Sequence, residues 1–189
     1  RTVLKVVNLE TKQVRQVTDD STWYDTEGEF TYEWAPDGKW FALCIIGNKH
    51  DPYTDIGLVS ANGGKVTNLT NSGYTSHSPR WVLDGNAILF TTERYGMRAH
   101  ASWGSQNDVM LAFVNQDAYD KFNLSKEDYE LQKDLEKEQK KAKDADKDKK
   151  DKEEAKKEEV KPIKVELAGI EDRIVRLTPN SSNLGDAIL

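Results

Sequence analysis

One short pattern occurs twice in this chain and limits what the chain can fold into. In the second copy, the strand-like run His77–Val82 leads into Asp84-Gly85, and Ala87–Thr92 leads out. Asp-Gly between two such runs predicts a β-hairpin with a tight turn, because Gly adopts the positive φ that the turn needs. Ala87–Thr92 is rich in aliphatic, aromatic and β-branched residues, which suit a buried strand.

The first copy has the same layout. Phe30–Trp34 leads into the turn Pro36–Lys39, and Trp40–Ile46 leads out. Trp34 and Trp81 precede the Asp of their turns by the same interval, and those Asp residues, at positions 37 and 84, are 47 residues apart. A repeat of about 40–50 residues with one aromatic-flanked turn in each copy indicates β-propeller blades rather than a β-sandwich.

A second kind of hairpin alternates with the first. Val3–Leu9 with Gln13–Val17, and Asp55–Ser60 with Lys65–Leu69, each read as strand, turn and strand, and a threonine follows each pair. We therefore expect units with the order hairpin, polar link, hairpin, which gives four strands in each unit. The predicted fold is all-β, a partial β-propeller of about three four-stranded blades.

The third unit begins at Asp108–Val114 and is interrupted by a polar segment. Ser125 can cap a helix there, and Asp128 suits the first turn of that helix. Lys133–Lys161 is almost entirely charged and cannot bury enough apolar surface to offset its chain entropy. We expect a solvated helix that grades into disorder, and then a return to strand-like sequence that ends with Ile170–Thr178.

These boundaries divide the chain into three parts. Residues 1–114 form propeller blades, residues 115–161 a helical and then Lys/Glu-rich insertion, and residues 162–189 the continuation of the third blade. The chain starts directly in strand-like sequence and shows no signal-peptide pattern, so we interpret it as a piece of a longer protein.

Composition excludes several classes of function. The net charge of −6 does not indicate a nucleic-acid binder. The one cysteine, Cys44, lies in an apolar run and is expected to be a buried structural thiol. The three histidines, His50, His77 and His100, have no metal-ligand spacing, so we expect neither a metal nor another cofactor. The sequence contains no run of about 18 apolar residues, so it predicts no membrane-spanning helix.

The most unusual loop is Glu93–Asn107, which joins two predicted strands. Its Arg side chains can bind carboxylates, and its aromatic rings can stack on other side chains. The candidate peptide-contacting residues are therefore Arg94, Arg98, His100 and Trp103. The alternative is a connector between blades, in which the Arg pairs with a neighbouring acid and the Trp packs between the sheets.

Two resemblances follow from these motifs. Trp34–Lys39 and its relative Trp81–Gly85 resemble the WD40/PD40-type repeat of TolB-like propellers, which also occurs in prolyl oligopeptidase-type enzymes and so indicates a fold rather than a function. A longer pattern resembles the N-terminal propeller region of tricorn-type proteases of the S41 class, and the Lys/Glu-rich insertion is similar to that of Bacteroides-type bacterial members. Its matching segments are Glu93–Arg98, His100–Ser105, Asn107–Val109, Asn115–Tyr119, Leu124–Asp128, Gly169–Arg173 and Leu177–Pro179.

The tricorn resemblance covers nearly the whole chain but only a fraction of that family's polypeptide. It implies a propeller that guides or sorts peptides toward a serine-peptidase domain absent from this chain, so no catalytic residue is assigned here. The implied partners are peptides or oligopeptides and the remaining blades and catalytic domains of the parent chain. The resemblance also allows a homo-oligomeric parent. The implied location is periplasmic, with a cytoplasmic one as the alternative.

Two other interpretations remain open at this stage. The chain could belong to a TolB-like binding or scaffold propeller of the cell envelope with no enzyme attached, or to the propeller cap of a prolyl-oligopeptidase-type hydrolase. A PDZ-like region elsewhere in the polypeptide favours the tricorn interpretation over the first alternative. An α/β-hydrolase nucleophile elbow favours the second.

Overall fold

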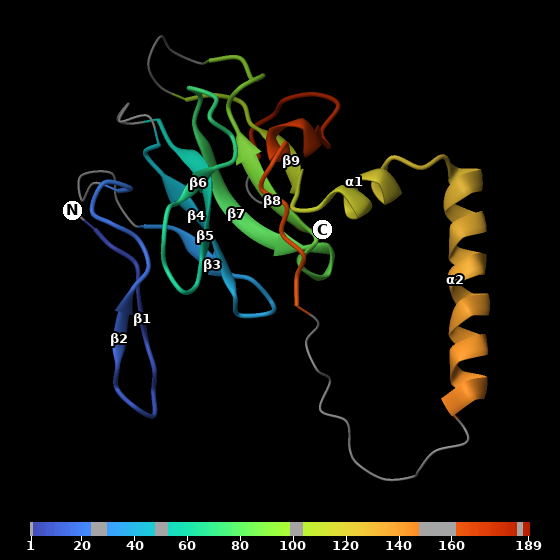
Figure 1. The fold of residues 1–189 in the computed structure, drawn as a ribbon. Coiled ribbons are helices and arrows are strands. Elements are labelled where there is room, and N and C mark those ends of the chain that lie inside the picture. The colour runs from blue at the N-terminus through green and yellow to red at the C-terminus, as the bar shows by residue number, and fades with distance from the viewer. Residues whose placement is uncertain (1, 24–29, 48–52, 99–103, 148–161, 185–186) are drawn as a thin grey trace.

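A computed structural model describes residues 2–23, 30–47, 53–98, 104–147, 162–184 and 187–189. Antiparallel sheets make up most of it and helices are few, which confirms an all-β fold (Figure 1). The strands are β1 (Lys5–Val7), β2 (Val14–Gln16), β3 (Tyr32–Trp34), β4 (Trp40–Ile45), β5 (Asp55–Ser60), β6 (Thr67–Asn68), β7 (Ser76–Val82), β8 (Ala87–Thr92), β9 (Asp108–Phe113) and β10 (Ile174–Arg176).

The predicted hairpins form, but they group into sheets differently from the predicted units. Among the described residues there are two four-stranded sheets, with strand orders β3-β4-β5-β6 (the first sheet) and β7-β8-β9-β10 (the second sheet). A two-stranded sheet, β1-β2, stands beside them as the N-terminal hairpin. Each tryptophan-flanked hairpin therefore opens a sheet, and the hairpin that follows it closes the same sheet. The predicted grouping is therefore wrong: it is offset by one hairpin from the sheets that form.

The loop at Asp84-Gly85 is wider than the tight turn we expected, whereas Pro36–Lys39 forms the four-residue turn that the sequence predicts, closed by the Ala35 N–H donating to Trp40 O at 2.8 Å. Val82 pairs with Ala87, so four residues form the loop between β7 and β8. Its φ angles are positive at Leu83 (53°), Asp84 (54°) and Gly85 (83°). The loop therefore needs the left-handed region at two residues that carry a Cβ, in addition to the Gly that the sequence marks.

A shared core holds the two four-stranded sheets together. Alternate side chains of β4 and β5, including Cys44 and Leu58, pack against those of β8 and β9, including Phe90 and Ala112. Glu33 on β3 adds a polar contact, because its carboxylate accepts a hydrogen bond from the backbone N–H of Trp81 on β7. The opposite face of the first sheet packs against Leu4 and Val17, which flank the N-terminal hairpin.

A repeated polar contact closes the outer edge of each sheet. Asp55 and Asp108 occupy the first position of β5 and β9, and both are buried. Thr70 Oγ1 donates to Asp55 at 2.7 Å, and Thr178 Oγ1 donates to Asp108 at 2.6 Å. The threonine hydroxyl also accepts the N–H of the residue after each Asp, and Thr18 accepts the N–H of Leu4 in the same way. The threonine that ends each hairpin in the sequence thus has a structural role.

The insertion leaves the second sheet between β9 and β10. It begins with α1 (Gln116–Phe122), which Asn115 caps by accepting the N–H of Ala118 at 2.9 Å, and continues as α2 (Lys126–Lys147). Ser125 caps α2 as expected: its hydroxyl accepts the N–H of Asp128 and donates to the Asp128 carboxylate. Helix α2 stands away from the sheets (Figure 1). Residues 148–161 of the charged run lie outside the described part.

Three apolar side chains that could have docked α2 remain exposed, namely Tyr129, Leu131 and Leu135. One ion pair joins the two helices, between Lys121 Nζ and Glu136 Oε1 at 2.9 Å. Both groups are about half exposed, so this pair contributes little to stability. None of the described helices is both long and apolar enough for a membrane span.

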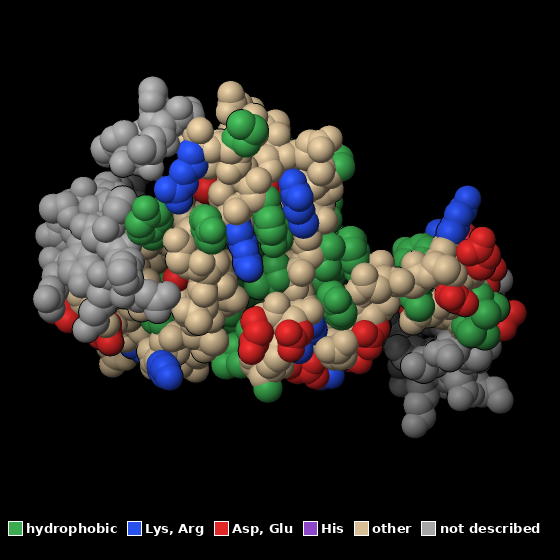
Figure 2. Space-filling model, turned by 90° about the horizontal axis from the view of Figure 1, so that it is seen from above, with side chains coloured by type: hydrophobic (Ala, Val, Ile, Leu, Met, Phe, Trp, Pro, Cys, Tyr) green, Lys and Arg blue, Asp and Glu red, His purple; other side chains and the backbone are tan. Residues whose placement is uncertain are grey.

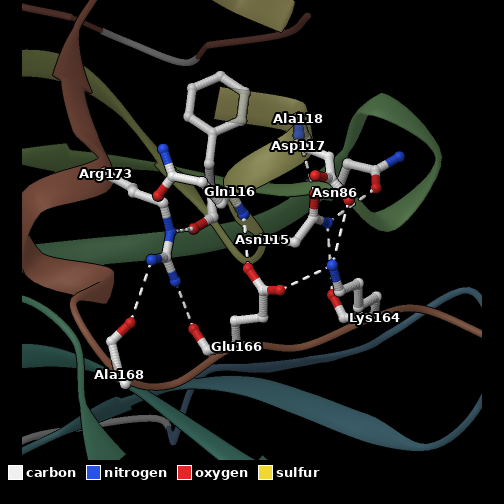
Figure 3. A network of polar contacts seen from close by, with 10 residues as sticks. Asn86, Asn115, Gln116, Asp117, Ala118, Lys164, Glu166, Ala168 and Arg173 are labelled. Carbon is white, nitrogen blue, oxygen red and sulfur yellow. Dashed lines mark hydrogen bonds and ion pairs between the residues drawn. The ribbon is translucent and has the colours of Figure 1, made fainter. Parts of the chain in front are cut away.

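A buried polar network fixes the chain where it returns from the insertion (Figure 3). The segment 162–167 runs alongside the end of β9 without forming the strand that the sequence suggests. Arg173, which is 5% exposed, donates to the carbonyl oxygens of Phe113, Ala168 and Glu166. Asn115 joins the same network by donating to Lys164 O at 3.3 Å. The guanidinium therefore links β9 to the returning chain.

Burial of Cys44 leads to a testable expectation. The thiol is 3% exposed, and burial raises its pKa to about 11, although a hydrogen bond with the backbone of Ser78 acts in the opposite direction. Because the thiolate is the reactive form, Cys44 should not react with a thiol reagent such as DTNB near pH 8 until urea unfolds the chain. Stoichiometric reaction of the native chain within minutes would contradict this expectation.

Candidate functional site

The two features that the sequence singles out lie at opposite ends of the sheets. The loop Glu93–Asn107 joins β8 to β9 at the end where β7 and β9 begin. The insertion and both Asp-Gly turns lie at the other end. Figure 2 views the molecule from the loop end, where basic side chains lie on either side of a strip of hydrophobic ones.

The described parts of the loop form a narrow two-stranded arm. Arg98 and Ser105 make an isolated antiparallel bridge, and the N–H of Gln106 donates to Met97 O at 3.1 Å. A Cβ on Gly96 would lie 1.8 Å from the Gln106 carbonyl oxygen, so only glycine fits at this position. The sequence of the arm therefore suits this close backbone approach.

At the base of the arm, a pocket of about 220 Å³ lies against the second sheet and is bordered by the link that follows β6. Its apolar wall is formed by Phe90, Met110 and Ile174. The rest of the lining is hydroxylic or charged: Thr70, Ser72, Ser76, Thr92, Arg94, Tyr95 and Glu171. The lining is therefore mostly polar, with one apolar wall, and the pocket is smaller than the sites that enclose a whole small-molecule ligand.

The positive charge at the pocket comes from arginine beside tyrosine, and Glu171 adds a negative charge to the lining. The guanidinium of Arg94 lies 5.6 Å from the centre of the Tyr95 ring, and that of Arg176 lies 4.9 Å from it. Arg176 forms an ion pair with the buried carboxylate of Asp108 at 2.8 Å. Arg94 is exposed and makes no ion pair with any residue in the described ranges. Arg94 is therefore the cation available to a ligand.

The structure separates the candidate residues that the sequence proposes. Arg94 lines the pocket. Arg98 is exposed further along the arm and does not line it. His100 and Trp103 lie outside the described residues. Sequence reasoning did not connect Glu171 and the hydroxyl groups with this loop, because they come from links and strands that the sequence does not place nearby.

The described site offers hydroxyl groups, a guanidinium and apolar surface to a ligand. Within the described ranges, no three or more His, Cys, Asp or Glu side chains are grouped so that they could hold a metal ion. His77 lies away from the pocket, on β7, with Nδ1 3.0 Å from Thr91 Oγ1. Together the hydroxyl groups, the Arg94 guanidinium and the Tyr95 ring can bind one side chain that carries a carboxylate.

The comparisons with known proteins concern the fold. No family model matches the chain, and no curated protein matches it. Among solved structures, it is similar to a structure described as "Crystal structure of the tricorn protease". The TM-score is 0.56 at 11% sequence identity, and the similarity covers 96% of this chain and 15% of that chain. At this level of identity the similarity shows a shared fold, and this chain spans only a small part of the tricorn protease.

Proposed function

We propose that this chain is a β-propeller segment of a tricorn-like serine peptidase and that it guides peptides toward a catalytic domain located elsewhere. The observation that carries the proposal is the similarity to the tricorn protease fold over 96% of the chain. Two four-stranded antiparallel sheets with sequential strand order, packed face to face, have the composition and arrangement of consecutive blades. The motifs in Glu93–Asn107 and Gly169–Pro179 favour a tricorn-like parent over the two alternative propeller families.

In this proposal the pocket at the loop end contacts the peptide. Arg94 binds a carboxylate of the peptide, because its guanidinium is exposed and makes no ion pair among the described residues. Tyr95 provides a ring face beside it, and the apolar wall around Phe90 accepts a side chain. The pocket of about 220 Å³ holds one side chain rather than a whole peptide, which suits guidance better than tight capture.

Peptide binding by the Arg94→Gln variant tests this proposal. We expect the chain to bind fluorescein-labelled acidic peptides weakly, and the variant to bind them about tenfold more weakly, since a charge-assisted hydrogen bond is lost. Fluorescence anisotropy measures both affinities. Peptides in which Gln replaces Glu should show little difference between the two proteins.

The matched control is Lys65→Gln, which removes one positive charge from the β5–β6 turn at the opposite end of the sheets. It should leave the affinity unchanged, and chromatography after the titration should recover the peptide uncleaved. Equal affinities for the Arg94→Gln variant and the unmodified chain would contradict the proposed site. Turnover that resists repurification and a serine-reactive inhibitor would contradict a role limited to guidance.

A further inference from the structure

Two side chains of opposite charge line the pocket at the loop end. Arg94 comes from the arm that follows β8, and Glu171 comes from the short 3₁₀-helix Ile170–Arg173 before β10. Both side chains are exposed, and no ion pair joins them to each other or to any other residue in the described ranges. The lining therefore offers a cation and an anion to the same ligand.

A buried hydroxyl group adds an unused hydrogen-bond acceptor. Ser76 is 1% exposed and lines the pocket. Its hydroxyl donates to Thr92 Oγ1 at 3.1 Å, and the Thr92 hydroxyl in turn donates to the carbonyl oxygen of Thr75 at 3.3 Å. The proton of Ser76 is thereby engaged, and no described residue donates to its oxygen. A serine oxygen keeps free lone pairs in this arrangement, so it favours a ligand group that donates hydrogen bonds.

Other hydroxyl groups of the lining are used within the fold. Thr70 Oγ1 donates to Asp55 and accepts the N–H of Ile56. The Ser72 hydroxyl exchanges hydrogen bonds with the backbone of Tyr74. For a ligand, Arg94 remains as a charged donor, and Glu171 and Ser76 remain as acceptors.

The volume of the pocket limits which ligand can reach all three groups. About 220 Å³ holds one side chain, so a basic and an acidic side chain from two residues of a peptide do not fit together. The first residue of a peptide can carry both charges by itself when it is glutamate or aspartate, since it has a free ammonium group and a carboxylate. Its methylene groups suit the apolar wall of Phe90, Met110 and Ile174.

We propose that the pocket binds the amino-terminal residue of a peptide when that residue is glutamate or aspartate. The side-chain carboxylate pairs with Arg94, the free ammonium group donates to Glu171 and to Ser76 Oγ, and the rest of the peptide leaves the pocket from the carbonyl group. This inference rests on the proposed peptide-binding role of Arg94. It adds which position of the peptide the pocket recognises.

Acetylation of the peptide tests the inference. The probe is a short peptide with glutamate first and no other charged residue, labelled with fluorescein at its carboxyl-terminal end and titrated into the full 189-residue chain. We expect the acetylated peptide to bind about tenfold more weakly, because it has lost the charged donor for Glu171. A peptide with glutamate in an internal position should bind no better than the acetylated one. Fluorescence anisotropy measures each affinity.

The Glu171→Gln variant keeps the size of the side chain and removes its charge. It should bind the peptide with a free amino terminus about tenfold more weakly, and should distinguish it from the acetylated peptide by less than about twofold. Asp172→Asn is the matched control, since Asp172 is exposed on the same 3₁₀-helix and does not line the pocket. This control should keep the full preference for a free amino terminus.

The possible results separate this inference from the proposed function. Equal affinities for the free and acetylated peptides, or an undiminished preference in Glu171→Gln, would overturn the inference and leave Arg94-dependent binding of acidic peptides intact. Failure of every acidic peptide to bind would refute the proposed function and the inference with it. Free glutamate carries the same charges without a peptide. If it displaced the peptide at equal concentration, the pocket would be an amino-acid site and the assignment to peptides would be wrong.

Discussion

Replacing Asp108 with alanine is expected to cost about 3 kcal/mol of unfolding free energy, at the low end of the range for breaking a buried ion pair. The Asp108 carboxylate is fully buried and accepts hydrogen bonds from Arg176, Thr178 and Ser181. Arg176 is one third exposed and can regain water when its partner is lost, which limits the cost. Urea unfolding followed by tryptophan fluorescence measures the change.

The stability lost in the Asp108→Ala variant should also depend on pH. Burial raises the pKa of Asp108, but hydrogen bonds from Thr178, Ser181 and Arg176 and the charge of Arg176 outweigh it, so the pKa lies below the usual 3.8. Because the folded-state pKa is below the unfolded one, the stabilisation is complete above about pH 3.8 and disappears as pH falls through the folded-state value. The gap between the native chain and Asp108→Ala should therefore narrow in acid.

An exposed aspartate provides the control for this measurement. Asp134 on α2 pairs with Lys137, and both side chains are more than half exposed. Asp134→Ala should therefore leave the unfolding midpoint nearly unchanged. If Asp108→Ala behaved like this control, the buried contact would not stabilise the outer edge of the second sheet.

Replacing Arg173 with methionine is the second substitution with a large expected effect, about 2–4 kcal/mol. Methionine is apolar and fills similar space, but it leaves the carbonyl oxygens of Phe113, Ala168 and Glu166 without their donor. The unfolding free energy of Arg173→Lys should lie between those of the unmodified chain and Arg173→Met, since one ammonium cannot reproduce the planar guanidinium fork. The measurement is again urea unfolding, and a loss below about 0.5 kcal/mol for Arg173→Met would contradict the role assigned to this network.

The local parts of this fold could be predicted from the sequence. Trp34 and Trp81 with their Asp-Gly turns identify hairpins correctly, and Ser125 marks the start of α2, because these signals act over a few residues. The apolar run around Cys44 likewise indicates burial. In each case the same short segment carries both the signal and the structure.

The assembly of the hairpins could not be predicted in the same way. Contacts between hairpins decide whether β4 pairs with β5 or ends a four-stranded sheet. The turn residues carry no information about these contacts. The Asp108 and Thr178 contact spans 70 residues because the insertion separates its partners. The sequence signal for this contact has two parts, the Asp at the start of β5 and of β9 and the threonine after each outer hairpin, and only the threonine lies at a hairpin end that the local pattern marks.

The pocket shows the same limit. Arg94 was found because it lies in an unusual loop, but its neighbours Ser72 and Glu171 come from a link and from the short 3₁₀-helix Ile170–Arg173 that precedes β10. Nothing local in their sequence indicates a site. The exposed Trp34 could likewise not be distinguished from the partly buried Trp81, because both tryptophans of the repeat have the same sequence context.

The most direct test of the central claim is a titration of the ¹⁵N-labelled chain with an unlabelled acidic peptide, followed by NMR. A peptide-guiding propeller segment predicts shifts concentrated at Thr70, Ser72, Thr92 and Tyr95, around the pocket at the loop end. Shifts confined to α1, α2 or the Asp-Gly turns at the opposite end, or no shifts at millimolar peptide, would contradict it.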